Sequence, residues 1–229
     1  MHDTHQGSPR GPVPRVLILV GSPRRAGNSA TLAAAVERGA VAAGAAAQIS
    51  FIDDHVTSFL RDCRTCRLPS GACAISDGFR DLFFEAFLPA DAVVFCSPVY
   101  WYGLSAQTKA FFDRTFCYYA ASHPRSAEVI QGMSHKRIGL VLASEETYPG
   151  AALGIIHQIQ EFARYTHSDF AGVVRGVGNS RSEVARDPES PMAAAEALGR
   201  ELFARKYTDY RLDTQRSGRV WPPAGPGEG

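Results

Sequence analysis

The chain has 229 residues, of which 45% are hydrophobic and 21% are charged, so it is long enough to bury one core without disulfide cross-links. Its 24 Lys and Arg residues nearly balance its 23 Asp and Glu residues, and the formal charge of +1 excludes the basic excess that is typical of nucleic-acid-binding proteins. The longest apolar runs are far shorter than a membrane helix, which needs roughly 18 residues. We therefore expect neither a nucleic-acid nor a membrane partner.

The cysteines and the amino-terminal residues indicate the compartment. The sequence holds five cysteines, an odd number, and residues 1–14 contain neither a basic start nor an apolar run of the signal-peptide kind. Cysteines that stay reduced are typical of the cytoplasm. We therefore expect a cytoplasmic protein.

Short segments rich in Val, Ile and Leu alternate with segments of helical periodicity along the chain. The expected strands comprise residues 13–20, 47–53, 91–96, 137–144 and 170–176, and the expected helices comprise residues 28–43, 78–88, 104–119, 150–165 and 191–206. Strict alternation of this kind predicts right-handed crossovers and a parallel sheet covered by helices on both faces. The predicted fold is therefore α/β: a flavodoxin-like, three-layer, doubly wound, five-stranded parallel sheet in the order 2-1-3-4-5.

The alternating pattern predicts one domain, residues 15–206. Residues 1–14 and 207–229 flank it, and we expect both to be flexible because they have little apolar surface to bury. Residues 54–77 interrupt the pattern with a 24-residue connection that contains three of the five cysteines. An ordinary turn takes roughly 2 to 6 residues, and loops as long as this one are usually functional or disordered.

A polar loop, residues 21–29, follows the first expected strand and precedes the first helix. Backbone N–H groups and the positive end of the helix dipole favour an anion at this place. Ser22, Asn28 and Ser29 can hydrogen-bond phosphate oxygens, and Arg24 supplies a forked cation. The alternative is an ordinary turn in which Asn28 or Ser29 caps the helix.

An aromatic loop follows the third expected strand, beside the predicted switch point of the sheet. It consists of Ser97, Pro98, Val99, Tyr100, Trp101, Tyr102 and Gly103. Three consecutive aromatic side chains are costly to expose unless something stacks on them. The aromatic loop and the phosphate loop together suit a planar ligand with a phosphate at one end, which is the shape of FMN. The alternatives are that the aromatic residues cap the core or form a subunit contact.

These segments resemble the flavodoxin-like NAD(P)H-dependent FMN reductases and their relatives, the multimeric flavodoxin-type and iron–sulfur flavoproteins. The matching residues are Gly21-Ser22-Pro23-Arg24 with Gly27-Asn28-Ser29, then Cys63, Cys66 and Cys73, then residues 97–103, and finally Ser105, Lys109, Phe112, Asp113 and Arg114. The resemblance extends over residues 15–206.

The resemblance implies a noncovalently bound FMN and NADPH or NADH as the electron donor. The residues it implies at the FMN phosphate are Ser22, Arg24, Asn28 and Ser29, and those at the ring are residues 97–103. The loop that begins at Ser144 would lie near the polar edge of the ring, although Glu145 and Glu146 depart from the glycine-rich loop that is frequent there. The resemblance also implies a homodimer or homotetramer.

Three cysteines in the 54–77 connection have the spacing Cys63-x2-Cys66-x6-Cys73. The related iron–sulfur flavoproteins hold a cluster with four cysteines, so a cluster would be one ligand short here unless Cys96, Cys117 or a partner subunit supplied the fourth. A zinc site would have the same shortage. A redox-active pair is the sharper alternative, because Cys63 and Cys66 have CxxC spacing and neighbouring arginines, which lower thiol pKa values. Free or structural thiols are the remaining interpretation.

We predict an FMN-dependent NAD(P)H oxidoreductase that passes electrons to a small-molecule acceptor: a quinone, a flavin or a specific metabolite. Catalysis would depend on the flavin, with Cys63 and Cys66 as candidate redox thiols. The alternative is an electron carrier of the flavodoxin or iron–sulfur flavoprotein type that serves a protein partner. The near-neutral charge weighs against the carrier, since flavodoxins dock through strongly acidic surfaces.

Overall fold

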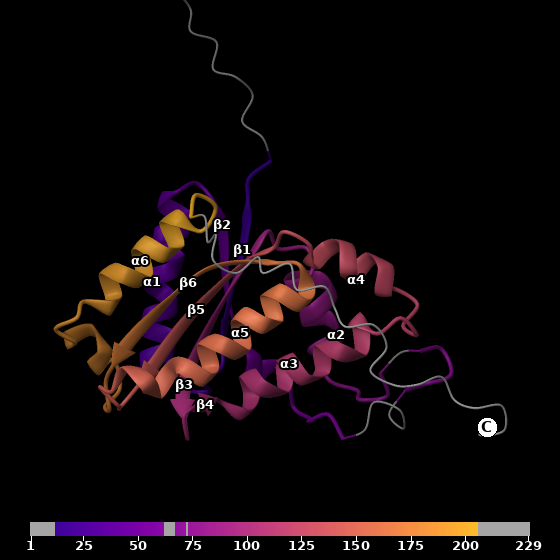
Figure 1. The fold of residues 1–229 in the computed structure, drawn as a ribbon, viewed down its shortest axis with the longest axis horizontal. Coiled ribbons are helices and arrows are strands. Elements are labelled where there is room, and N and C mark those ends of the chain that lie inside the picture. Colours follow the sequence, from indigo (N-terminus) through magenta and orange to yellow (C-terminus); the bar gives the residue numbers. More distant parts are fainter. Residues whose placement is uncertain (1–11, 62–66, 72, 206–229) are drawn as a thin grey trace, which may run out of the picture.

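The computed structural model describes residues 12–61, 67–71 and 73–205, and these form a parallel sheet between two layers of helices (Figure 1). The strands are β1 (Arg15–Val20), β2 (Ala46–Phe51), β3 (Ala92–Tyr100), β4 (Gly103–Leu104), β5 (Arg137–Ser144) and β6 (Asp169–Val177). Their order is β2-β1-β3-β5-β6, and the two-residue β4 pairs with the end of β3 in an antiparallel hairpin. The predicted fold class is confirmed, because the five parallel strands lie in the expected order.

Helices cover both faces of the sheet (Figure 1). Helices α1 (Asn28–Ala42) and α6 (Pro191–Glu201) pack on one face, and α2 (Phe79–Asp81), α3 (Ala106–Tyr119), α4 (Ser126–Met133) and α5 (Leu153–Thr166) pack on the other. Helices α1 and α6 approach closely because both contain glycine at the crossing: a Cβ atom at Gly39 would lie 1.9 Å from the Glu196 carbonyl oxygen, and one at Gly199 would lie 2.1 Å from that of Val36.

The continuous apolar run of β1 follows from its central place in the sheet. Leu17 and Leu19 pack into the core beneath α2 to α5, whereas Val16, Ile18 and Val20 pack into the core beneath α1 and α6. Successive side chains of a strand point to opposite faces, so a strand that is covered on both faces must be apolar at every position. The loop after β1 thus begins at the centre of the sheet.

Several elements differ from the sequence predictions, and the expected helix 191–206 already ends at Glu201. The expected helix 78–88 is a short α2 followed by a π-helical turn, Leu82–Phe87, whose wider winding accompanies the burial of Phe83 and Phe87 in the aromatic core. Helix α4 was not predicted, because its eight residues bury only Val129 and Met133, too short a pattern for periodicity to detect. The third strand extends to Tyr100, four residues past its predicted end.

The described helices and strands occupy residues 15–201, within the predicted domain. Residues 1–11 and 206–229 lie outside the described residues, so the expected flexibility of the two ends stays a prediction. In the part of the chain that the structure describes, no helix combines the length and the apolar character that crossing a membrane requires.

A buried ion pair ties the 54–77 connection to α3. The Arg114 guanidinium donates two hydrogen bonds to the Asp77 carboxylate, one of them 2.7 Å long, and both side chains are almost completely buried. Burial alone raises the pKa of Asp77, but hydrogen bonds from Arg114 and from the backbone N–H groups of Thr57 and Phe79 outweigh it, so the pKa lies below its ordinary value. The ion pair therefore anchors both ends of the 54–77 connection against the aromatic core.

Lys136 is buried beneath α4 and donates hydrogen bonds to the carbonyl oxygens of Leu88 and Ala90. Burial lowers the pKa of its amine to about 8 from an ordinary value of 10.5. The unfolded chain thus binds more protons than the folded protein between pH 8 and 10.5, so this group makes the protein more stable as the pH rises through that range.

We expect this gain to amount to about 3 kcal/mol and to disappear in Lys136→Met. Urea unfolding at pH 7.5, 9 and 10.5 measures the free energy of unfolding of each protein, and the difference between wild type and variant removes the contributions of other groups that titrate in that range. Lys109→Met is the matched control, because Lys109 pairs with Asp113 on the exposed surface of α3. Parallel pH profiles for wild type and Lys136→Met would contradict the prediction.

Candidate functional site

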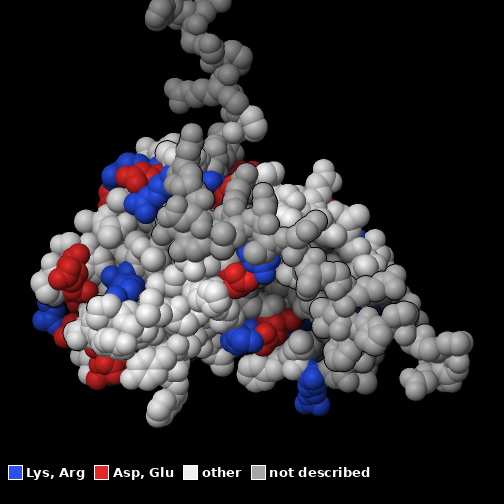
Figure 2. All heavy atoms as spheres, viewed as in Figure 1, with Lys and Arg blue, Asp and Glu red and all other residues white. Residues whose placement is uncertain are grey.

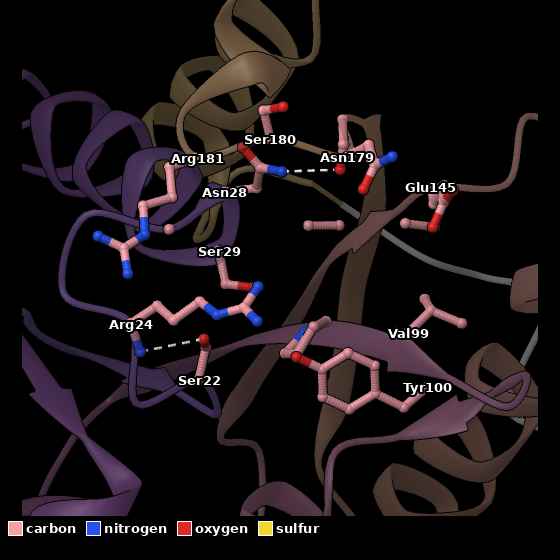
Figure 3. A pocket seen from close by; sticks show the side chains of 15 residues that line it. Ser22, Arg24, Asn28, Ser29, Val99, Tyr100, Glu145, Asn179, Ser180 and Arg181 are labelled. Atoms are coloured by element: carbon pink, nitrogen blue, oxygen red, sulfur yellow. Dashed lines mark hydrogen bonds between the residues drawn. The ribbon is translucent and has the colours of Figure 1, made fainter.

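Four strands of the sheet end around one pocket. The carboxyl ends of β1, β3, β5 and β6, with the loops that follow them, enclose a cavity of about 180 Å³ (Figure 3). The predicted site residues that line it are Ser22, Arg24, Asn28, Ser29, Pro98, Val99, Tyr100 and Ser144. This place is the topological switch point of an open α/β sheet, where ligands of such folds bind.

The loop between β1 and α1 supplies hydroxyl and amide donors. Gly27 caps α1, and the N–H groups of the first helical turn have no acceptor within the helix. Ser22 and Ser29 are only 4% and 3% exposed. The Ser22 hydroxyl accepts a hydrogen bond from the Arg24 backbone N–H (3.3 Å), whereas no described residue hydrogen-bonds to the Ser29 hydroxyl. A hydroxyl at the wall of a pocket that has no partner among the described residues suits a ligand oxygen.

Arg24 and Arg25 are adjacent but serve different purposes. The Arg24 side chain extends into the pocket, and its guanidinium forms none of the ion pairs of the described residues (Figure 3). Arg25 instead pairs with Asp53 and Asp54 and lies 4.0 Å above the ring of Phe51. Arg25 therefore holds the loop against the end of β2, and Arg24 is the cation that remains for a ligand.

The Asn28 side chain, a predicted phosphate contact, hydrogen-bonds to the loop after β6. Its amide nitrogen donates to the carbonyl oxygen of Gly178 (2.8 Å), and its amide oxygen accepts from the backbone N–H of Val184 (3.2 Å). Both polar atoms of the Asn28 side chain therefore bond to the loop after β6, and its backbone N–H is the group that remains available to a ligand in the pocket.

The loop after β6 lines the pocket with Asn179, Ser180 and Arg181, which the sequence analysis missed. The sequence did contain a signal for these residues: they follow the last predicted strand, which ends at the same carboxyl edge of the sheet as the others. They are far from the phosphate loop in the sequence, so periodicity gave no reason to connect them with it. The packing of α1 against α6 brings the loop after β6 beside the phosphate loop.

The predicted aromatic loop is in fact the end of β3, a two-residue turn and β4. Tyr100 pairs with Gly103, and Trp101 and Tyr102 form the turn with left-handed φ angles of 49° and 58°. Tyr100 lines the pocket, whereas Trp101 is 96% exposed and Tyr102 lies beside Glu146 on the outer surface. Bulky residues in this conformation cost roughly 1 to 2 kcal/mol each, so the turn presents aromatic side chains at the expense of backbone stability.

Ser97 was predicted to contact the ligand, but its side chain is fully buried behind the pocket. Its hydroxyl lies in a network with Ser105 and Thr108, and the Ser105 hydroxyl donates to the carbonyl oxygen of Gly21 (2.6 Å). Gly21 has no room for a side chain, because a Cβ atom there would lie 1.8 Å from the Thr108 hydroxyl oxygen. The network joins the phosphate loop to the start of α3.

The loop after β5 separates the pocket from a second, larger cavity. The Ser144 hydroxyl donates to the carbonyl oxygen of Glu146 (2.9 Å), which turns the chain away from the sheet. Beyond this loop lies a cavity of about 900 Å³ against β6, which shares Glu145, Gly178 and Asn179 with the first pocket. The two cavities therefore adjoin at the loops that follow β5 and β6.

The cysteine predictions fall mainly outside the site. Cys63 and Cys66 lie outside the described residues, so their redox role stays a prediction. Cys73 is a free thiol whose backbone pairs with Arg67 in an isolated bridge. Cys96 is buried in β3, and burial raises the pKa of its thiol, which makes it a small apolar side chain. Among the described residues, no group of three His, Cys, Asp or Glu side chains could hold a metal ion.

The residues of the pocket fit FMN. Polar donors gather at the α1 end: the Ser22 and Ser29 hydroxyls, the first amides of α1 and the Arg24 guanidinium. Pro98, Val99 and Tyr100 supply apolar and aromatic surface at the β3 end. Glu145 is the one acidic residue among the described residues that line the pocket. A phosphate at one end and a flat apolar ring at the other match this division.

Known proteins share this fold and parts of this sequence. The chain is 25% identical over 186 residues to the Bacillus subtilis protein YwqN, assigned as an NAD(P)H-dependent FMN-containing oxidoreductase, and the match covers 81% of this chain and 97% of YwqN. It is 31% identical over 100 residues to an iron–sulfur flavoprotein of Archaeoglobus fulgidus, with 44% of each chain covered. The solved structure of the Trp repressor binding protein from Bacillus subtilis superposes with a TM-score of 0.62 at 22% identity, over 80% of this chain and 98% of that one.

The family model described as NADPH-dependent FMN reductase matches residues 14–165. This range is more than half of the chain and contains β1 to β5 with the phosphate loop and the aromatic hairpin. The chain therefore belongs to the NADPH-dependent FMN reductase family and is an FMN-containing flavoprotein oxidoreductase that uses NAD(P)H.

Proposed function

We propose that this enzyme passes electrons from NADPH or NADH, through bound FMN, to a small-molecule acceptor such as a quinone, a flavin or a specific metabolite. The observation that supports a small acceptor is the cavity of about 900 Å³ that adjoins the flavin pocket at Glu145, Gly178 and Asn179. It offers a concave place for a molecule of metabolite size beside the cofactor.

The surface also favours a small acceptor over a protein partner. On the face shown in Figure 2, acidic and basic side chains are interspersed, and neither sign forms a continuous patch. A carrier that docks on protein partners needs a surface of one sign to steer the encounter. The formal charge of +1 agrees with this view of the surface.

The phosphate of FMN would be held by Ser22, Ser29, Arg24 and the first amides of α1, and its ring would lie against Pro98, Val99 and Tyr100. When bound, FMN supplies the hydride-accepting and electron-donating chemistry of the reaction. The chain's own residues would bind and orient the cofactor: the loop after β1 would hold its phosphate, and the end of β3 would cover one side of its ring.

We further propose a cytoplasmic homodimer or homotetramer. Trp101 and Tyr102 place an exposed apolar tip beside the pocket, and Leu153 at the start of α5 is also exposed. Apolar side chains gathered in this way are typical of a contact with another chain. Cys73 and Cys96 are free thiols, the state that a reducing compartment maintains.

The test is the visible spectrum of anaerobic protein reconstituted with FMN and then titrated with NADPH. We expect resolved flavin bands that bleach on addition of NADPH and return when a quinone or free flavin is added. Slow bleaching with NADPH and NADH, together with fast electron transfer to a protein acceptor, would support a carrier instead. A protein that binds no FMN would contradict the proposed function.

A further inference from the structure

The loop after β6 adds a second cation to the proposed phosphate site. Arg181 lines the same pocket as Arg24, although the two residues are far apart in the sequence. Figure 3 shows the Arg181 side chain descending from the loop after β6 toward the loop that carries Arg24. Arg181 lies outside residues 14–165, the range that the family model matches, so it is a feature of this chain beyond the matched pattern.

A set of hydrogen bonds holds this loop in place. Asn28 bonds to Gly178 and Val184 through both ends of its amide. The Ser182 hydroxyl donates to the carbonyl oxygen of Ala26 (3.1 Å) and accepts from the Thr31 hydroxyl (3.3 Å). The neighbours of Arg181 are therefore fixed to the phosphate loop and to the first turn of α1, which brings its guanidinium to the site.

Glu183, an acidic residue of the same loop, bonds to other partners than Arg181. The Glu183 carboxylate accepts hydrogen bonds from the backbone N–H groups of Ser180 (2.7 Å) and Asn179 (2.8 Å), which lower its pKa, and it pairs with Arg186. Arg181 takes part in none of the hydrogen bonds or ion pairs of the described residues. The charge of Glu183 is thus balanced within the loop, and the Arg181 guanidinium remains for a ligand.

Two guanidinium groups and the Ser29 hydroxyl, none of which has a hydrogen-bond or ion-pair partner among the described residues, meet the positive end of a 15-residue helix at one pocket. Cations that lie together without an anion repel one another, and an anion between them removes the repulsion. We infer that Arg181 binds the phosphate group of FMN together with the β1 loop and makes the enzyme selective for FMN over riboflavin, with Asn28 as the residue that positions it. This inference rests on the proposed FMN site.

The test compares the affinity of apoprotein for FMN and for riboflavin, measured by flavin fluorescence. We expect Arg181→Ala to weaken FMN binding about tenfold and to leave riboflavin binding within about twofold, because riboflavin has no phosphate. FMN binding by wild type should also weaken more steeply with salt than binding by Arg181→Ala. Asn28→Ala, which keeps the charge but releases the loop, should cause the same phosphate-selective loss, and the double variant should lose no more than either single variant.

Arg186→Ala is the matched control, since it removes the same charge from the same loop but from a guanidinium that is paired with Glu183 and exposed. An equal loss of FMN affinity in Arg186→Ala would overturn the inference, because the net charge of the loop would then explain the effect. Equal losses for FMN and riboflavin in Arg181→Ala would also overturn it. Unchanged FMN affinity in Arg181→Ala, with weakened binding in Arg24→Ala, would reject Arg181 but leave the proposed function standing. A wild type that binds neither flavin would reject both.

Discussion

Asp77→Asn should lower the free energy of unfolding by about 3 to 5 kcal/mol, because it leaves the buried Arg114 guanidinium without its counter-charge. Asp77 and Arg114 are 3% and 1% exposed, so water cannot replace the lost partner. The carboxylate also accepts from the N–H groups of Thr57 and Phe79, and an amide in its place cannot accept from all of these donors. Urea unfolding at pH 7 measures the loss, and the melting temperature should fall by about 10 °C.

Asp113→Asn is the control for this prediction. It changes the same residue type opposite a cation on the same helix, but its pair with Lys109 is exposed to solvent. Exposed ion pairs contribute little to stability, so we expect an unfolding curve close to that of wild type. The interpretation of Asp77 as the anchor of the 54–77 connection would be wrong if both substitutions had equally small effects.

Arg24→Ala should weaken FMN binding by about 1.5 to 3 kcal/mol, or roughly 10- to 150-fold in Kd, because it removes a charged hydrogen-bond donor from the phosphate. Ser22→Ala should weaken binding in the same direction. Riboflavin affinity should change little in Arg24→Ala, since the lost contact is with the phosphate alone. Titration of apoprotein with each flavin provides the measurement.

Arg38→Ala is the control for Arg24. Arg38 also carries a positive charge on α1, but it lies on the exposed surface and pairs with Glu196 at 3.5 Å. Its removal tests whether a general loss of positive charge reduces FMN affinity. Retention of full FMN affinity by Arg24→Ala would contradict the assignment of the β1 loop as the phosphate site.

Much of the fold could be predicted because its signals are local. β1 is apolar from Val16 to Val20 because both faces of this part of the strand are covered, and the pattern shows in five consecutive residues. The loops that hold Arg24 and Tyr100 follow predicted parallel strands, so they had to meet at the carboxyl edge of the sheet. The fold class and the general place of the site therefore followed from periodicity and topology.

The roles of single side chains depended on partners that are distant in the sequence. Asn28 has the right residue type for a phosphate contact, but its partners Gly178 and Val184 lie on a loop that only the packing of α1 against α6 brings near. Ser97 follows the predicted strand, but its hydroxyl is directed into the core by Ser105 and Thr108 at the start of α3.

The sequence by itself determined the α/β class, the strand order and three of the loops at the cofactor site, those after β1, β3 and β5, because these depend on alternation along the chain. Tertiary structure alone decided that Asn28 positions a loop, that Ser97 is buried and that Arg181 joins Arg24 at the pocket. The physical reason is that a side chain's hydrogen bonds depend on which neighbours lie within about 3 Å in the folded protein, and sequence patterns do not record that distance.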